Sequence, residues 1–310
     1  MPNAREELFE NAKIFHINDT NRLKTQPKPS GAYLEGTYFY NNKKDEDRSL
    51  DIHLPNEKKD TYPIIFYVHG GAWIYGNKDL YSYFCTYMAS KGFAVVAINY
   101  RVLPKTDLNG IAKDIFAALS WLKENAASKN LNLNRLYLIG DSAGGQLAGL
   151  TLGINYSKTM QGLYRIKDLG LDFKASCLVC PCRSVELNRS GESALYVNHE
   201  LEMLALGGRG ELNPIKTHMS IPDVLRDCFK DGVINSIKPI LLISGYYDSC
   251  YENTLNIKSD LEKAKVPHEL FAYSKDDPDY LTHDYPINRW EYEESQKANN
   301  YMADFFLKNY

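Results

Sequence analysis

The residues that could do chemistry start with a serine between glycines, in the pattern Gly140-x-Ser142-x-Gly144. The apolar run 136–139 before it is typical of a strand, and the apolar residues within 147–150 fit the start of a buried helix. A tight strand-to-helix turn requires small neighbours and exposes its hydroxyl at the edge of a sheet. The pattern therefore predicts Ser142 as a nucleophile.

A serine nucleophile needs backbone donors for the oxyanion that develops in the reaction. Residues 69–73 follow the expected strand 64–68 and contain two adjacent glycines, which let a backbone approach a substrate carbonyl. An ordinary glycine turn after a strand is the alternative. We expect an oxyanion hole made by the backbone amides of Gly70, Gly71, Ala72 and Ala143.

The serine also needs a base, and seven histidines compete for that role. His283 lies in the loop 274–286 after the last expected strand, where it should pass over the carboxyl edge of the sheet. The other histidines lie early in the chain, in the glycine loop, in the expected cap or at the start of the last strand: His16, His53, His69, His199, His218 and His268. The sequence therefore predicts His283 as the base.

The base needs an acid to orient it, and Asp248 lies just beyond the expected strand 240–243. The chain order of serine, aspartate and histidine is the order that triads take where the serine lies on such a strand-to-helix turn. The rival acids are Glu252 and three residues of a turn-like loop near the base, Asp276, Asp277 and Asp279. We expect Asp248 to be the acid.

These positions require a sheet whose strands end at one edge. The expected strands are 34–40, 48–54, 64–68, 93–98, 136–139, 176–179, 240–243 and 269–273. The first two should form an antiparallel hairpin with one wet face, whereas the later continuous apolar runs are typical of parallel strands buried on both faces.

Amphipathic segments lie between the expected strands. They include 80–90, 111–122 with Asn109 as its cap, 254–265, and 290–307, which has Tyr301, Met302, Phe305 and Phe306 on its apolar face. The alternation predicts an α/β fold with a doubly wound, mostly parallel eight-stranded sheet flanked by helices. Ligands of such sheets bind beyond the carboxyl ends of the strands.

The chain of 310 residues fits one domain, 1–310. Residues 1–33 should form an N-terminal arm, a short helix followed by an irregular segment. Residues 183–238 are far longer than a usual connection and predict an inserted cap, with short helices near 193–206 and 222–229 that help to shape the substrate pocket.

The net charge of −3 and the mixture of both signs argue against a nucleic-acid partner. Acidic residues at the N-terminus argue against a signal peptide, and the apolar runs are too short to span a membrane, so we expect a cytoplasmic protein. Six scattered cysteines predict buried thiols. The cluster Cys177, Cys180 and Cys182 lacks a second ligand pair for zinc, so no metal or cofactor is expected.

From about residue 35 onward, the chain resembles the hormone-sensitive-lipase-like and acetyl-esterase group of α/β-hydrolase carboxylesterases. The resemblance rests on the motifs His69-Gly70-Gly71-Ala72-Trp73, Asn99-Tyr100-Arg101-Val102-Leu103-Pro104, Gly140-Asp141-Ser142-Ala143-Gly144-Gly145, Gly245-x-x-Asp248 and His283. It implies a serine esterase that works through an acyl-enzyme, without metal or cofactor, on small or medium acyl esters.

The chain departs from that family at three positions. Ala72 replaces a glycine, although its amide can still donate. Ser249 and Cys250 follow the acid, and Asp284 follows the base, where a second carboxylate should raise the pKa of His283.

Sequence alone leaves other activities open. An amidase or aryl-formamidase could use the same triad, and a non-catalytic binding protein could share the fold. The small-molecule ester is undefined among acetylated sugars, hydroxycinnamate esters and aliphatic esters, and a homo-oligomer is also left open. Five aromatic residues could stack on a substrate or only pack at the rim: Trp73, Tyr75, Tyr81, Tyr246 and Tyr247.

Overall fold

A computed structural model describes residues 3–41, 43–187 and 192–310. All eight strands expected from the sequence are present, and they form one sheet in the order β1-β2-β4-β3-β5-β6-β7-β8. The strands are β1 (Ala32–Phe39), β2 (Ser49–Pro55), β3 (Tyr62–Val68), β4 (Ala94–Ile98), β5 (Leu131–Asp141), β6 (Phe173–Val179), β7 (Ile240–Gly245) and β8 (His268–Tyr273).

The sheet is parallel from β4 to β8, and only β1 and β2 run antiparallel to their neighbours. Every residue of β3, β4 and β7 is buried, as continuous apolar strands covered on both faces require. The predicted doubly wound sheet is therefore confirmed.

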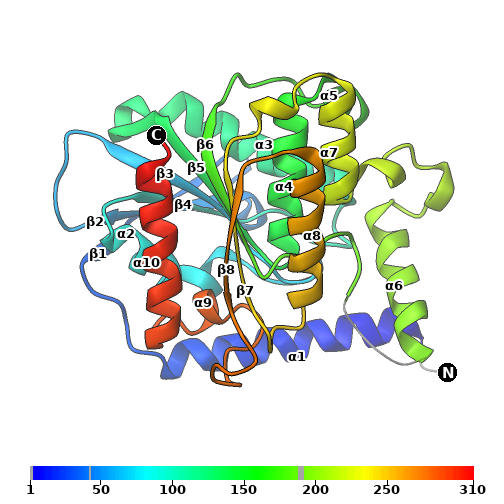
Figure 1. Cartoon of the computed structure of the whole chain (residues 1–310), viewed down its shortest axis with the longest axis horizontal. Coiled ribbons are helices and arrows are strands. Elements are labelled where there is room, and N and C mark those ends of the chain that lie inside the picture. The colour runs from blue at the N-terminus through cyan, green and yellow to red at the C-terminus, as the bar shows by residue number, and fades with distance from the viewer. Residues whose placement is uncertain (1–2, 42, 188–191) are drawn as a thin grey trace.

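Helices cover both faces of the sheet (Figure 1). Helices α3, α4 and α8 pack on one face, and α2 and α10 pack on the other. The helices are α1 (Ala4–Thr25), α2 (Ser82–Ser90), α3 (Leu108–Asn125), α4 (Ala143–Tyr156), α5 (Lys158–Tyr164), α6 (Glu192–Ala205), α7 (Ile221–Lys230), α8 (Tyr251–Ala264), α9 (Tyr285–Asn288) and α10 (Glu293–Lys308).

The expectation that the first hairpin has one solvent-exposed face is wrong for β2, because all seven of its residues are buried. Its polar side chains have partners: Asp51 lies 3.1 Å from Lys78 Nζ, and His53 Nδ1 lies 3.1 Å from Thr86 Oγ1 of α2. Strand β2 lies between β1 and β4 and packs against α2, so only the edge strand β1 remains largely exposed.

Two local predictions for the helices are also wrong. Helix α3 is capped by Asp107, whose carboxylate accepts the N–H of Gly110 at 2.8 Å, and not by Asn109. Tyr301 of α10 is 39% exposed, because its hydroxyl donates to Glu269 at 2.6 Å on the surface instead of packing in the core.

The N-terminal arm begins with a long helix, where a short one was expected. Helix α1 has 22 residues and extends past the ends of β7 and β8 to α6 (Figure 1). Near its end, Arg22 and Gln26 both donate to the backbone carbonyl of Asn288 in α9, at 3.2 and 2.6 Å. These contacts attach the arm to the segment that follows His283.

The segment between β6 and β7 contains α6 and α7, close to the two helices expected in the cap. Residues 188–191 of the expected cap and residues 1–2 of the expected arm lie outside the described part of the chain. None of the helices in the described ranges combines the length and the apolarity that a bilayer crossing requires.

Candidate active site

Ser142 lies on the turn between the end of β5 and the start of α4. Its backbone is strained, with φ 52° and ψ −119°, and the residue is 7% exposed. A Cβ atom on Gly140 would lie 2.1 Å from the carbonyl oxygen of Gly144, and one on Gly144 would lie 2.2 Å from that of Val68. The turn is therefore too tight for a side chain at either glycine.

Three of the predicted site residues form one chain of hydrogen bonds. Ser142 Oγ lies 2.8 Å from His283 Nε2, and His283 Nδ1 lies 2.6 Å from Asp248 Oδ1. A proton on Nδ1 donates to the carboxylate and leaves Nε2 to accept the serine proton. The arrangement can therefore activate the serine hydroxyl as a nucleophile.

Asp248 is 5% exposed and is held on both of its oxygens. Ser244 Oγ donates to Oδ2 at 2.6 Å, and the N–H of Cys250 donates to Oδ1 at 2.8 Å. Burial raises the pKa of Asp248, but the charge and hydrogen bond of His283, with the bond from Ser244, outweigh it and lower the pKa below its ordinary value. Asp248 is therefore ionised at neutral pH.

The rival acids of the loop lie in a surface turn. Asp276 and Asp279 are exposed, and Asp277 accepts the N–H and the hydroxyl of Ser274 at 2.6 and 2.8 Å. This is the capping role that aspartate takes in turns. The contact with His283 Nδ1 belongs to Asp248.

A second carboxylate, Asp284, lies beside the base. Its Oδ2 is 3.2 Å from His283 Nε2, and its Oδ1 is buried without a partner among the described residues. Burial raises the pKa of Asp284 well above its ordinary value. Burial lowers the pKa of His283, but the carboxylates of Asp284 and Asp248 outweigh this and raise it well above the ordinary value.

The glycine loop after β3 offers two of its three expected oxyanion donors. The N–H groups of Gly71 and Ala72, with that of Ala143, have no hydrogen-bond partner in the described part of the chain. Gly70 is different, because its N–H donates to Asp141 Oδ1 at 2.9 Å. The expectation that Gly70 is an oxyanion donor is therefore wrong.

The loop itself is held by hydrogen bonds that the sequence analysis did not predict. Trp73 Nε1 donates to Gln146 Oε1 of α4 at 3.0 Å, and Gln146 Nε2 donates to the carbonyl of Met219 at 2.5 Å. Asp141 accepts from Tyr67 at 2.6 Å as well as from Gly70, and its burial raises its pKa to about 6. The one signal for these contacts in the sequence was Gln146, a polar residue in the otherwise apolar first turns of α4.

A cavity of about 380 Å³ opens over Ser142. Its lining combines apolar side chains with the catalytic candidates, and α1 supplies one wall. The lining residues are Leu8, Asn11, Phe15, Asn18, Asp19, Gly71, Ala72, Ile74, Tyr75, Tyr81, Ser142, Cys182, Leu187, Ser249, Cys250, His283, Asp284 and Asn288. Among the described residues that line the cavity there are two carboxyl groups but no lysine or arginine.

The five aromatic residues expected near the mouth of the site separate into three groups. Tyr75 and Tyr81 line the cavity. Trp73 is fully buried behind the glycine loop, and Tyr246 and Tyr247 are 51% and 40% exposed and are absent from the lining. Only two of the five can therefore meet a substrate in this cavity.

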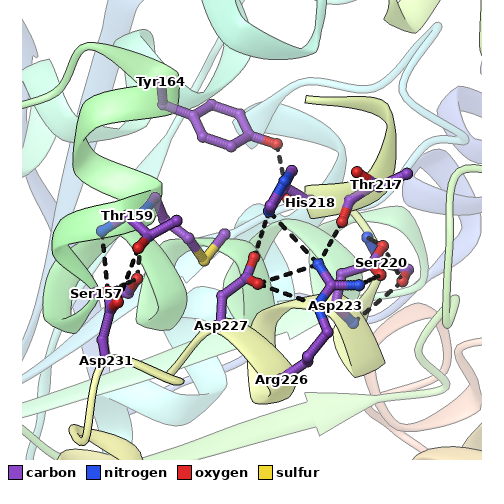
Figure 2. Close-up of polar contacts among 11 residues, drawn as sticks. Ser157, Thr159, Tyr164, Thr217, His218, Ser220, Asp223, Arg226, Asp227 and Asp231 are labelled. Carbon is purple, nitrogen blue, oxygen red and sulfur yellow. Dashed lines mark hydrogen bonds and ion pairs between the residues drawn. The ribbon is translucent and has the colours of Figure 1, made fainter. Parts of the chain in front are cut away.

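His218, another of the candidate bases, is engaged elsewhere. His218 lies in a polar cluster that joins α7 to the segment before it (Figure 2). There, His218 Nδ1 is 2.5 Å from Asp227 Oδ2, Arg226 contacts Asp223 at 2.7 Å, and the Ser220 hydroxyl caps α7. This cluster stabilises the second helix of the expected cap.

Comparisons with known proteins find relatives over part of the chain. A family model described as BD-FAE matches residues 50–174. Arylacetamide deacetylase of Bos taurus is 33% identical over 141 residues, 44% of this chain and 33% of that protein. Kynurenine formamidase of Danio rerio is 28% identical over 113 residues, 36% of this chain and 37% of that protein. The matched region thus spans about a third of these relatives.

A solved structure matches over nearly the whole chain. Esterase B of Lactobacillus rhamnosis superposes with a TM-score of 0.90 at 27% identity, and the match covers 98% of this chain and 95% of the esterase. An esterase of the bacterial hormone-sensitive lipase family, at 18% identity and a TM-score of 0.65, shares the fold.

Proposed function

The chain is an α/β-hydrolase of the hormone-sensitive-lipase-like esterase group, and on this premise we propose that it is a serine carboxylesterase for small to medium acyl esters. The observation that carries the proposal is the chain of contacts from Ser142 Oγ through the imidazole of His283 to Asp248, at 2.8 and 2.6 Å. A hydroxyl, an imidazole and an ionised carboxylate in this order are the groups that acyl transfer requires.

In the proposed mechanism, Ser142 attacks the ester carbonyl while His283 takes the serine proton at Nε2. Asp248 holds the imidazole and stabilises its charged form. The free N–H groups of Gly71, Ala72 and Ala143 bind the oxyanion of the tetrahedral intermediate. His283 then protonates the leaving alcohol, and water that His283 activates releases the acid from the acyl-enzyme.

The cavity supports an uncharged substrate with a short acyl chain. A volume of about 380 Å³ suits a small ligand, and Leu8, Phe15 and Ile74 supply an apolar wall. The similar esterase B is described with a tributyrin phosphonate inhibitor, which carries butyryl-sized chains. We therefore propose butyrate-sized esters as the preferred class.

Amide cleavage is the second candidate function. Two relatives are named for it, the kynurenine formamidase and the arylacetamide deacetylase. The same triad cleaves esters and amides, so the difference lies in the pocket. A higher kcat/KM for N-formyl-kynurenine than for the best p-nitrophenyl ester would select the formamidase.

The deciding experiment compares the unmodified protein with Ser142→Ala. We expect hydrolysis of p-nitrophenyl esters from acetate to octanoate, with a maximum near butyrate, and weaker hydrolysis of methyl ferulate and an acetylated sugar. Ser142→Ala should lower kcat by on the order of 10⁴-fold or more and abolish fluorophosphonate labelling. Ser249→Ala is the matched control, because it removes another cavity serine and should keep the label. An unmodified protein that neither turns over esters nor takes the label would be a binding protein on this fold.

A further inference from the structure

Two side-chain oxygens of the cavity lining have no hydrogen-bond donor. Among the described residues that line the cavity, only Asp284 and Asn288 carry a buried side-chain oxygen without a hydrogen-bond partner, Oδ1 in each case. Leaving a buried acceptor unpaired costs free energy, so native proteins keep few such groups. The mechanism proposed above uses neither oxygen. A ligand that fills this cavity is therefore expected to bring hydrogen-bond donors to both.

Both oxygens belong to the short segment that follows the base. Asp284, which is 5% exposed, is the N-cap residue of α9, and Asn288 is the last residue of that helix. The N–H of Asn288 donates to the carbonyl of Asp284 at 2.8 Å and closes one helical turn. Side chains four positions apart on such a turn lie on the same side of it. One ligand can therefore contact Asp284 and Asn288 together.

The position of Asp284 indicates which part of a substrate meets these oxygens. Asp284 Oδ2 lies 3.2 Å from His283 Nε2, the nitrogen that protonates the leaving alcohol in the proposed mechanism. The oxygen of the leaving alcohol must therefore come close to Asp284. A hydroxyl group on the neighbouring carbon of that alcohol would reach the carboxyl group of Asp284, and a hydroxyl group one carbon further along would approach Asn288.

The charges around these oxygens favour an uncharged donor. Asp284 faces His283, and Asp19, the other carboxylate of the described lining, lies 3.4 Å from Arg22 Nε. Each carboxylate thus has a basic side chain beside it, so an ammonium group on the substrate would find neither carboxylate unpaired. A hydroxyl group needs only the acceptor oxygen.

We propose that Asp284 and Asn288 bind two hydroxyl groups on the alcohol part of the ester, which makes esters of polyols the substrate class of this site. The proposal rests on the esterase function proposed above and adds the alcohol side to it. A hydroxyl group that donates to Asp284 also competes with His283 for this carboxylate, and so helps to leave Nε2 free for Ser142.

The test compares glycerol monobutyrate with propyl butyrate. The two esters share the acyl group and the three-carbon alcohol and differ only in the two hydroxyl groups. The ratio of their kcat/KM values is divided by the ratio of their rates of alkaline hydrolysis, which removes the difference in intrinsic reactivity. We expect this normalised ratio to favour glycerol monobutyrate by about tenfold or more, because propyl butyrate leaves both acceptors unpaired.

The role of Asn288 is tested with Asn288→Leu, which removes the amide oxygen and keeps a side chain of similar size. The normalised ratio should fall roughly fivefold. Asn109→Leu is the matched control, because Asn109 Oδ1 is also buried without a partner among the described residues but does not line the cavity. Its ratio should equal that of the unmodified protein. If Asn288→Leu does not fold, Asn288→Ala replaces it.

Three results would overturn the subsite while the esterase function stands. The first is hydrolysis of p-nitrophenyl butyrate with a normalised ratio near unity. The second is an equal fall of the ratio in Asn288→Leu and Asn109→Leu. The third is a higher kcat/KM for butyrylcholine than for glycerol monobutyrate, which would mean that the acidic lining selects a cation.

Failure of the esterase function is recognised separately, by a protein that hydrolyses none of these esters. The subsite is then tested by binding, with full-length Ser142→Ala protein titrated with each ester and followed by nuclear magnetic resonance. Glycerol monobutyrate should bind about tenfold more tightly than propyl butyrate. Equal affinities for the two esters would overturn the subsite.

Discussion

The carboxylate of Asp284 lies 3.2 Å from His283, and it contacts Nε2, the same nitrogen that faces Ser142 Oγ at 2.8 Å. The serine hydroxyl and the carboxyl group therefore compete for one nitrogen. A proton held between Asp284 and His283 keeps Nε2 from accepting the serine proton, whichever of the two carries it. The base becomes available only when the pair loses that proton.

Asp284→Asn should move the acidic limb of the pH profile of kcat/KM to lower pH. Activity requires neutral His283, and Asp284 raises the pKa of His283, so the carboxylate pushes the acidic limb upward in pH. Without that charge, His283 loses its proton at lower pH. The measurement is kcat/KM for p-nitrophenyl butyrate between pH 5 and 9 in the variant and the unmodified protein.

The matched control for this change is Asp279→Asn, which neutralises an exposed aspartate of the same loop. Its pH profile should coincide with that of the unmodified protein. If both variants had the unmodified profile, Asp284 would have no influence on the base.

Phe15→Ala should weaken the preference for longer acyl chains. Phe15 of α1 lines the cavity and packs against Tyr75, with ring centroids 5.7 Å apart. Loss of about 1 kcal/mol of apolar contact predicts roughly fivefold lower kcat/KM for p-nitrophenyl hexanoate, with little change for the acetate. Ile17→Ala is the control, since Ile17 is 56% exposed on the same helix and does not line the cavity. Equal losses for hexanoate and acetate in Phe15→Ala would show that α1 does not contact the acyl chain.

An ester whose acyl chain carries a carboxylate should be hydrolysed with a lower kcat/KM. The described lining residues include Asp19 and Asp284 but no lysine or arginine. A carboxylate on the substrate would therefore enter the cavity without a positively charged partner. We expect kcat/KM for mono-p-nitrophenyl glutarate to be at least about tenfold below that for p-nitrophenyl valerate, which has the same chain length. The methyl ester of the glutarate substrate restores neutrality and should recover most of the rate. Comparable rates for the acid and its methyl ester would contradict this account of the cavity.

Gly144→Ala should destabilise the protein by at least about 3 kcal/mol. Its Cβ would lie 2.2 and 2.5 Å from the carbonyl oxygens of Val68 and His69, and these backbone atoms belong to the centre of the sheet and the oxyanion loop. Gly162→Ala is the control, because no atom lies within 4 Å of its Cβ position in α5 and alanine is the better helix former there, by about 0.5–1 kcal/mol. Thermal unfolding followed by circular dichroism compares the two. A Gly144→Ala protein as stable as Gly162→Ala would mean that the elbow can widen.

The central strands could be predicted because each is a short apolar run between polar segments, and burial on both faces leaves that pattern in the sequence. The positions of Ser142, Asp248 and His283 followed from the same information, since each lies in the segment after a strand whose carboxyl end reaches one edge of the sheet. These are local properties of the chain.

Other features depend on contacts between residues far apart in the sequence. Asp141 accepts a hydrogen bond from the N–H of Gly70, which is 71 positions away in the sequence. This contact alone decides which amides of the loop remain free for an oxyanion. The burial of Asp51 and His53 depends on the helix that packs over β2, and the cavity wall supplied by α1 depends on where Arg22 meets Asn288.

Cys182 and Cys250 show the same division. Their residue types and their strand-end positions are written in the sequence, but the 4.0 Å between their sulfur atoms results from how β6 and β7 lie side by side. Hydrophobic periodicity is a property of neighbouring residues. The sequence by itself therefore determined the strands, their order along the chain and the candidates for the triad. Distances between side chains depend on how the elements pack, so only the tertiary structure decided which donors are free, which thiols meet and which helix closes the cavity.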